Sequence, residues 1–196
     1  MWVILKQYFN IMIITEPKWK KWVVETQGPM FTPKLCQEII DLGKKQPKEK
    51  GKEEFGNKGR LSTISWLPFN VMQPVYDDIN IFIQRTNRNH FGFNDIQITE
   101  PAQFTEYQKG EFYSWHTDIS FNMHLEPPVR KLSMTLLLND PNEFEGGNLE
   151  IASNNLLPMK QGHAAIFASF LQHRITPVTR GLRKSLVMWF GGMPLK

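Results

Sequence analysis

Two histidines and one aspartate in this 196-residue chain have the types and spacing of a metal-binding set. His116 and Asp118 are separated by one residue, and His173 lies much further along the chain. On a β-strand, residues i and i+2 point to the same face, so His116 and Asp118 can approach one metal ion while Thr117 faces away. Two imidazoles and one carboxylate are the ligands of non-haem Fe(II) centres that keep coordination positions open for chemistry. Because such tripeptides also arise by chance, the set gains weight only from its neighbours.

Arg183 adds a group that a metal site alone does not need. It follows Thr179-Arg180-Gly181, which we interpret as a turn, and it leads into the apolar run 185–190. An arginine buried without a partner is costly, so Arg183 either reaches solvent or meets an anion. A guanidinium binds a carboxylate through two parallel hydrogen bonds, which suits a dicarboxylic acid. Tyr107, on the strand expected before the Gly110 turn, can offer its hydroxyl to the same anion.

The composition limits the class of protein. Hydrophobic content of 41% and charged content of 21% are typical of a globular chain, and the length is most simply one domain. The single cysteine, Cys36, excludes an intramolecular disulfide framework and favours a reducing, cytoplasmic location. We expect Cys36 to be a core residue. The apolar stretch Met1–Thr15 is too short to span a bilayer and lacks a cleavage site, so we interpret it as non-targeting, with Met12 as an alternative start.

The positive charge is concentrated in one segment. The net charge is +4, and residues 44–60 alone contain seven lysines and arginines against three glutamates. A solvated loop is the plainer interpretation of this segment. The alternative is an electrostatic guide for an acidic protein or a nucleic acid.

The first 95 residues contain two segments with the pattern of amphipathic helices. Thr32-Pro33 has the residue types of a helix start, and Gly43 is expected to help end that helix. A second helix begins at Pro74 and is expected to break within 89–94. Two short β-prone segments accompany these helices: 22–26 and 61–66.

From about residue 96, short β-prone segments alternate with turns. The expected strands are 96–107, 111–118, 130–138, 147–151, 163–168, 173–178 and 183–190. Many short strands after a helical start predict a mainly β fold, with a double-stranded β-helix (jelly roll) core over 96–191 braced by α-helices within 1–95. We therefore expect one domain over 1–196. An open immunoglobulin-like sandwich is the structural alternative, but it gives no reason for the ligand set.

Several blocks of this sequence, in the same order, resemble the Fe(II)/2-oxoglutarate-dependent oxygenases, in particular the prolyl 4-hydroxylase-like and PKHD-type hydroxylases. The resemblance extends over roughly residues 100–191, and its last block is the most specific. The blocks are Tyr107–Asp118, Leu132–Pro141, Phe144–Leu149, His173–Arg183 and Trp189.

The resemblance implies a role for each residue of the set. His116, Asp118 and His173 would hold Fe(II) as the catalytic centre, and Arg183 would bind the distal carboxylate of 2-oxoglutarate with the help of Tyr107. O2 would be the second cosubstrate, with ascorbate as a candidate reductant. The glycine pair at 146–147 would turn tightly near the metal strands, where the lack of a Cβ permits a close backbone approach.

The resemblance further implies hydroxylation of an unactivated C–H bond, with a peptidyl, prolyl-type side chain as the favoured substrate. A free amino acid or small metabolite is the main alternative. Alkylated nucleic acid is disfavoured, because 173–183 lacks the multi-arginine Asn/Thr motif of the demethylases. A cupin-like metal- or ligand-binding module is the non-enzyme alternative. Cupins begin with His-x-His and add a glutamate, whereas here Asp118 is the second ligand and Arg183 adds an anion anchor.

Contacts with a substrate are harder to predict. His124, in the loop after the expected metal strand, and Arg130, followed by Lys131, are candidate substrate residues. Segments 119–129 and 44–72 are candidate lids because they are long and polar. We expect a protein, peptide or small molecule as partner and no membrane, and we make no prediction of the oligomeric state.

Overall fold

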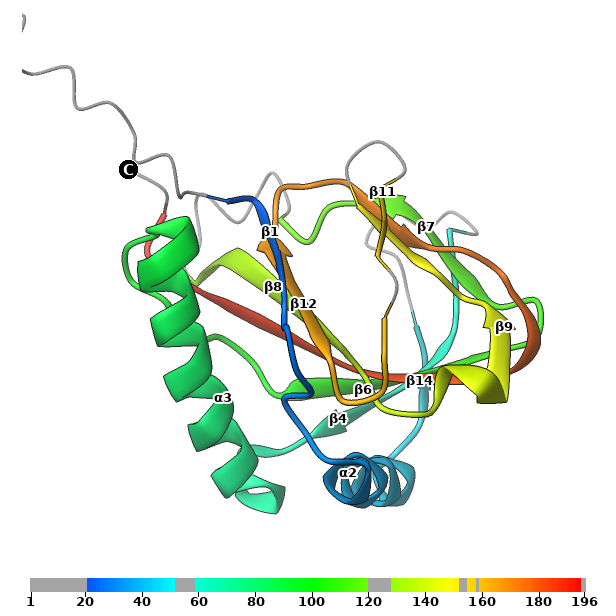
Figure 1. Ribbon diagram of the computed structural model, residues 1–196. Helices are drawn as coiled ribbons and strands as arrows, with labels where there is room; N and C mark the ends of the chain where they lie inside the picture. Colours follow the sequence, from blue (N-terminus) through cyan, green and yellow to red (C-terminus); the bar gives the residue numbers. More distant parts are fainter. Residues whose placement is uncertain (1–20, 52–58, 120–127, 152–154, 158, 195–196) are drawn as a thin grey trace, which may run out of the picture.

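Two antiparallel sheets, with two helices against the larger one, form the computed structural model of this chain (Figure 1). The structure describes residues 21–51, 59–119, 128–151, 155–157 and 159–194. His124, the stretch at residues 1–15 and parts of both candidate lids therefore lie outside the described residues. The mainly β prediction, with helices of the N-terminal half beside the sheet, is confirmed. In the described part of the chain, no helix combines the length and apolar character needed to cross a lipid bilayer.

The large sheet has nine strands and the small sheet has five. In spatial order the large sheet contains β1 (Val23–Glu25), β12 (Ala164–Ala168), β8 (Val129–Leu137), β14 (Val178–Gly192), β6 (Ala102–Gln108), β4 (Thr63–Leu67) and β2 (Glu49–Lys50). Two more strands pair with β14: β5 (Gln97–Ile98) and β9 (Phe144–Gly146). The small sheet contains β11 (Asn155–Leu157), β10 (Leu149–Ile151), β13 (His173–Ile175), β7 (Phe112–His116) and β3 (Arg60–Leu61). Short 3-10 turns lie at η1 (Phe69–Val71) and η3 (Pro141–Glu143).

Helix α2 (Pro33–Lys45) begins as the sequence predicts. The Thr32 hydroxyl accepts a hydrogen bond from the Leu35 amide at 3.2 Å, and proline occupies the first helical position. The prediction that Gly43 helps end this helix is wrong, because the helix continues to Lys45. A Cβ on Gly43 would lie only 2.4 Å from a ring carbon of Phe104 on β6. Gly43 is therefore the point of closest approach between helix and sheet.

Helix α3 (Gln73–Thr86) starts one residue before the predicted proline and continues into one π-helical turn, η2 (Asn87–Phe91). The end comes at Gly92, which has a φ of 77° and whose amide donates to the Asn87 carbonyl at 2.8 Å. The break expected within 89–94 is thus present, and a left-handed glycine produces it.

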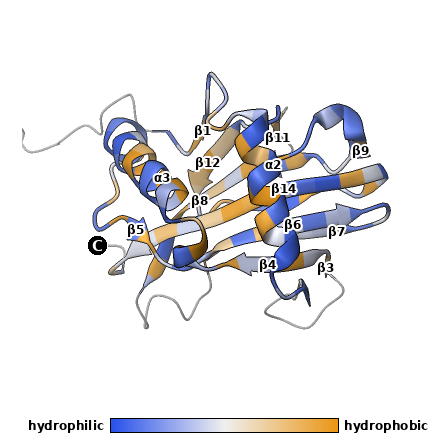
Figure 2. Ribbon diagram, turned by 90° about the horizontal axis from the view of Figure 1, so that it is seen from below, coloured by the Kyte–Doolittle hydropathy of each residue, from blue (hydrophilic) through white to orange (hydrophobic). Residues whose placement is uncertain are grey.

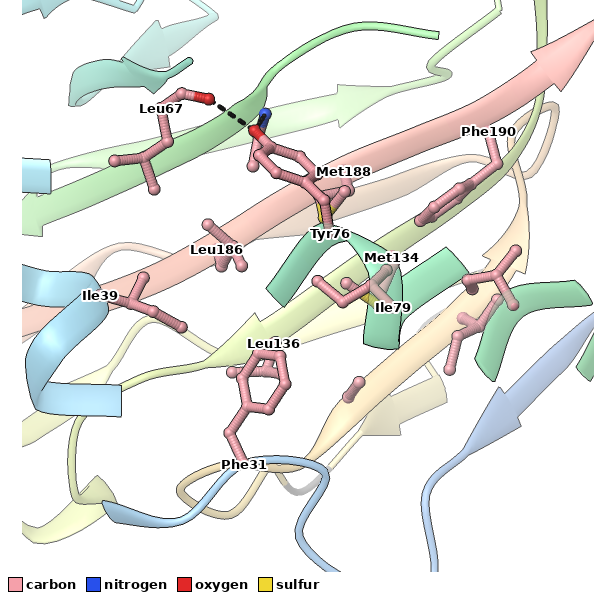
Figure 3. Packing of buried hydrophobic residues seen from close by; sticks show 14 of the residues in the cluster. Phe31, Ile39, Leu67, Tyr76, Ile79, Met134, Leu136, Leu186, Met188 and Phe190 are labelled. Atoms are coloured by element: carbon pink, nitrogen blue, oxygen red, sulfur yellow. Dashed lines mark hydrogen bonds between the residues drawn. The ribbon is translucent and has the colours of Figure 1, made fainter. Parts of the chain in front are cut away.

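Alternation of side chains divides the central strands of the large sheet into two faces. On one face, alternate residues of β8 and β14 are buried against helices α2 and α3 (Figure 3): Met134, Leu136, Leu186, Met188 and Phe190. The Tyr76 hydroxyl of α3 donates to the Leu67 carbonyl at 2.5 Å and accepts from the Ala102 amide at 2.6 Å, which ties the helix to two strands. Figure 2 shows both helices lying in front of this sheet.

The opposite face of the same strands is polar. Directly paired residues on β6, β14 and β8 share this face, and they include Gln103, Tyr107, Arg183, Ser185, Thr135 and Ser133. Each of these side chains is buried. Because the small sheet covers this side, the polar face becomes the floor of a pocket.

The turn predicted at residues 179–181 is wrong. Strand β13 stops at Ile175, and a single strand, β14, runs from Val178 to Gly192 straight through that segment. Gly181 has a φ of 75° and pairs with Phe144 of β9. The glycine that suggested a turn instead lets β14 pass close to the neighbouring backbone.

Cys36 is a buried core residue, as predicted. It lies in the cluster between α2 and the large sheet, and burial raises the pKa of its thiol to about 11. At neutral pH the group is therefore a protonated, unreactive thiol.

Replacement of Gly43 by alanine tests the contact between α2 and β6. Helix propensity alone favours alanine by about 1 kcal/mol. We expect the opposite result, because the new methyl group would overlap Phe104, and such overpacking costs about 1–3 kcal/mol. Urea denaturation should give a lower free energy of unfolding for Gly43→Ala. Lys44→Ala, at the next, exposed position, is the control and should change stability little. A Gly43→Ala protein that is more stable than wild type would contradict the close contact.

Candidate metal centre and its pocket

The three predicted metal ligands meet at the edge of the small sheet. His116 ends β7 and pairs directly with His173 at the start of β13. Asp118 lies just beyond β7, where its amide donates to the Ser169 carbonyl at 2.9 Å. Its carboxylate oxygens are 3.6 Å from His116 Nε2 and 3.4 Å from His173 Nε2. One donor atom from each side chain lies within 4.8 Å of the others. The expected convergence is present, although Asp118 reaches it from beyond the strand rather than by alternation along it.

A bulge in β7 brings a second aromatic ring to the site. His173 pairs with His116, but Ile175 pairs with Tyr113, so β7 contains one more residue than β13 between these points. Such a bulge lets Tyr113 and His116 face the same side although they are three positions apart. Their rings stack with centroids 3.5 Å apart and planes at 14°. Trp115 points to the opposite face, where the Arg174 guanidinium lies 4.9 Å from its ring.

Backbone carbonyls orient both imidazoles. His116 Nδ1 lies 2.8 Å from the Ser114 carbonyl, and His173 Nδ1 lies 3.0 Å from the Leu171 carbonyl. A ring nitrogen next to a carbonyl oxygen carries the proton, so the other nitrogen, Nε2, presents its lone pair. In both rings Nε2 is the atom that faces Asp118. This arrangement is typical of histidines that bind metals.

Asp118 is also fixed by a side chain of the large sheet. The Ser133 hydroxyl of β8 donates to Asp118 Oδ2 at 2.6 Å and lies 2.9 Å from the Ser169 hydroxyl. Sequence reasoning missed Ser133, within β8, and Ser169, in the turn after β12, because a serine beside an apolar segment gives no sign of its partner. The pair joins the candidate ligands of the small sheet to the large sheet.

The electrostatics of the three side chains suit a divalent cation. Burial, together with the neighbouring His173, lowers the pKa of His116 to about 3, so this imidazole is neutral at physiological pH. Burial alone would raise the pKa of Asp118, but His173, His116 and the Ser133 hydroxyl outweigh it and lower the pKa. A neutral imidazole and an ionised carboxylate are the forms that bind metal ions. The donor set therefore fits Fe(II) in its chemistry, and His116 and Asp118 fit it in protonation as well.

Arg183 lies in the same pocket and does not reach solvent. Its side chain is among the largest fully buried ones, with 1% of its surface exposed. Nη1 donates to the Ser185 hydroxyl at 2.9 Å, and the guanidinium carbon is 5.7 Å from the ring centre of Tyr107. Within the described part of the chain, Nη2 is buried and has no acceptor. Of the two outcomes expected from the sequence, an anionic ligand is the one that this geometry suits.

The glycine pair at residues 146–147 leaves room for this arginine. Gly147 has a φ of 60°, and a Cβ on it would lie 2.9 Å from both Arg183 Cδ and Val178 Cγ2. A side chain on Gly146 would lie 2.3 Å from the Pro177 carbonyl oxygen. The close approach expected here is therefore real, and it is made to the candidate anion anchor.

A pocket of about 420 Å³ contains both the candidate ligands and Arg183. Arg130 also lines it, but its guanidinium already binds Glu100 through two hydrogen bonds of 2.7 and 2.6 Å and stacks 4.0 Å from the Trp189 ring. The sequence analysis named Arg130 as a candidate substrate residue. Its pairing with Glu100 leaves it poorly suited to bind an acidic substrate. Lys131 donates to the Asn94 carbonyl at 2.7 Å.

Arg60 is a pocket residue that sequence reasoning missed. It was counted only as one charge in the basic segment 44–60. In the structure its Nη2 donates to Gln103 at 2.7 Å, its Nε donates to Ser62 at 2.8 Å, and its guanidinium carbon lies 4.5 Å from the centre of the Tyr113 ring. No motif marked it, because its position depends on the pairing of β3 with β7.

Comparison with known proteins identifies the family. A family model described as the 2OG-Fe(II) oxygenase superfamily matches residues 102–191. A PKHD-type hydroxylase of Klebsiella pneumoniae is 33% identical over 83% of this chain and 72% of its own length. The chain belongs to this oxygenase superfamily. PKHD-type hydroxylases of Xylella fastidiosa are 37% identical over 46% of this chain, and the chain spans 44% of their length, less than half.

Solved structures support the same fold for this chain. A viral collagen prolyl hydroxylase from Paramecium Bursaria Chlorella virus-1, in complex with 2-oxoglutarate, superposes with a TM-score of 0.68 at 19% identity. The match covers 87% of this chain and 96% of the viral one. The jelly-roll prediction is confirmed, and the immunoglobulin-like alternative is wrong.

Ser133→Ala tests how far the large sheet supports the candidate metal centre. Loss of the hydroxyl removes the hydrogen bond to Asp118 Oδ2, and loss of such supporting partners weakens metal binding by about 10- to 100-fold. Titration with Co(II), followed by its visible spectrum, would measure this change. The control is Ser65→Ala, a buried serine on β4 that faces away from the pocket. Equal Co(II) affinity of Ser133→Ala and wild type would show that the contact does not support the site.

Proposed function

We propose that this protein is an Fe(II)- and 2-oxoglutarate-dependent dioxygenase that hydroxylates an unactivated C–H bond. One observation carries the proposal: the donor atoms of His116, Asp118 and His173 lie together in the wall of a pocket that also contains the open guanidinium of Arg183. A metal-binding module without turnover, the cupin-like alternative, would not need that buried cation.

The proposal assigns each group to one partner. His116, Asp118 and His173 would hold Fe(II), while Arg183 and the Ser185 hydroxyl would hold the distal carboxylate of 2-oxoglutarate. Tyr107 is suited to assist, because burial raises the pKa of its hydroxyl and keeps the proton available for donation. When bound, Fe(II), 2-oxoglutarate and O2 supply the oxidising power, with release of succinate and CO2 and transfer of one oxygen atom to the substrate.

The protein side chains would do the positioning. The Arg183 guanidinium is held in place because its Nη1 donates a hydrogen bond to the Ser185 hydroxyl. Gly147 leaves space for the methylene groups of Arg183. A carboxylate there would satisfy the open Nη2 and neutralise the buried charge. Leu149, Ile175 and Val187 add apolar surface to the lining, which excludes water from around the reacting groups.

For the primary substrate we propose a peptidyl, prolyl-type side chain. Support comes from the likeness to PKHD-type hydroxylases in sequence and to a collagen prolyl hydroxylase in fold. A free amino acid or small metabolite is the second candidate, favoured by a further cation in the pocket, Arg60. Ascorbate dependence and a cytoplasmic location stay predictions.

His116→Ala tests the metal assignment. We expect loss of Co(II) binding and a fall of more than about 100-fold in succinate formation that depends on Fe(II) and 2-oxoglutarate, because two ligands cannot replace three. His163→Ala is the matched control: this histidine lies outside the pocket lining, with its Nδ1 3.1 Å from the Thr26 carbonyl. Full turnover by His116→Ala would show that His116 is not a metal ligand.

Arg183→Gln tests the site of 2-oxoglutarate separately from the metal. Removing the charge should weaken 2-oxoglutarate binding about 10- to 100-fold, since a hydrogen-bonded charge pair contributes roughly 1.5–3 kcal/mol. Co(II) affinity should stay close to that of wild type, because Arg183 is not a candidate ligand. Calorimetric titration of the Mn(II)-loaded protein with N-oxalylglycine, an analogue of 2-oxoglutarate, would measure the change. Unaltered binding of the analogue would exclude Arg183 as its anchor.

A further inference from the structure

Arg60 is a guanidinium inside the pocket, and no carboxylate of the described residues is paired with it. Its hydrogen-bond partners are the Ser62 hydroxyl and the Gln103 side-chain oxygen, both of them neutral. Within residues 21–51, 59–119, 128–151, 155–157 and 159–194, no carboxylate forms an ion pair with it. Arg60 is only partly exposed, so water screens its charge incompletely and a ligand anion could pair with it.

The other charges of the pocket are already balanced. If Fe(II) and 2-oxoglutarate bind as proposed, their charges together with those of Asp118 and Arg183 cancel. Arg130 is paired with Glu100, and Lys50 at the rim lies 3.9 Å from Glu111. Glu49, also at the rim, is exposed, so water screens its charge. Arg60 therefore remains as positive charge after the metal and cosubstrate have bound.

The position of Arg60 places that charge beside the candidate metal centre. Strand β3 pairs with β7 so that Arg60 stands directly opposite Tyr113, and the Tyr113 ring stacks on the His116 imidazole. From there the guanidinium reaches across to Gln103 on the large sheet. One aromatic ring thus separates Arg60 from a candidate metal ligand.

Arg60 is also held in one orientation. Ser62 fixes Nε, Gln103 fixes Nη2, and the face of the guanidinium lies over an aromatic ring. A planar donor group fixed in this way loses little freedom when a ligand binds, and its remaining N–H groups suit the two oxygens of a carboxylate.

We propose that Arg60 binds a carboxylate of the primary substrate, close to the carbon that is hydroxylated. This inference rests on the proposed function and deepens it by naming the substrate as an acid. The carboxylate belongs either to a free amino acid or small carboxylic acid, or to an acidic side chain next to the target residue of a peptide.

The test compares ligand pairs that differ only in charge. The full chain is loaded with Mn(II) and N-oxalylglycine, so that ligands bind without turnover. One arm uses free L-amino acids and their carboxamides. The other arm uses proline-containing peptides with Asp or Glu beside the proline, and the same peptides with Asn or Gln. Thermal shift finds the ligands, and calorimetry measures the dissociation constants.

We expect the best acid to bind at least about tenfold more tightly than its neutral partner, and the arm that contains it identifies the source of the carboxylate. Arg60→Gln should remove this preference, whereas Arg60→Lys should retain part of it. The matched control is Arg174→Gln, because Arg174 also lies over an aromatic ring but faces out of the pocket and pairs with Glu150. Melting without ligand shows whether each variant is folded.

Several results would overturn the inference: no panel member binds, acids bind no better than neutral partners, or Arg60→Gln keeps the preference. It is also overturned if Arg60→Gln weakens N-oxalylglycine by the same factor as the acid, because Arg60 would then serve the cosubstrate. Failure of the proposed function looks different. In that case the wild-type protein would not bind N-oxalylglycine in a Mn(II)-dependent way.

Discussion

The pocket depends on the strict alternation of side chains along the central strands of the large sheet. In β14, Leu186 and Met188 pack against the helices, while Ser185 and Trp189 face the pocket. A shift of one residue would exchange these two sets. Burial of the apolar set under α2 and α3 therefore fixes the register that turns the Arg183 guanidinium into the pocket. In this way the helices determine the geometry of a site that they do not touch.

The small sheet contributes the metal ligands, and the contact between the sheets aligns them. His116 and His173 receive their orientation from backbone carbonyls two residues earlier in the chain, Ser114 on β7 and Leu171 just before β13. Asp118 receives its orientation from Ser133 on the large sheet. Because each side chain is held before any ion binds, little conformational freedom is lost when the ion arrives.

The sequence predicted the parts of the site that depend on residue type and missed those that depend on pairing. The residue types of His116, Asp118, His173 and Arg183, together with the family resemblance of the blocks that contain them, predicted one pocket. The start of α2 was predictable because Thr32 and the proline after it act locally. Gly43, the bulge in β7 and the straight passage of β14 were not, because each reflects a contact between segments far apart in sequence. For the same reason Arg60 looked like any other charge in a basic segment.

The two guanidiniums in the pocket differ in depth, and this difference bears on the order of binding. Arg183 lies fully buried on the large sheet, at the floor of the pocket. Arg60 is partly exposed and extends from the small sheet toward the large one. A ligand for Arg183 has to pass into the deeper part of the pocket, and a ligand on Arg60 would stand between it and solvent. If both proposals hold, 2-oxoglutarate must therefore enter before the substrate. The substrate would then close the pocket, with its carboxylate neutralising the last unmatched cation, so that water is excluded only once all reactants are in place.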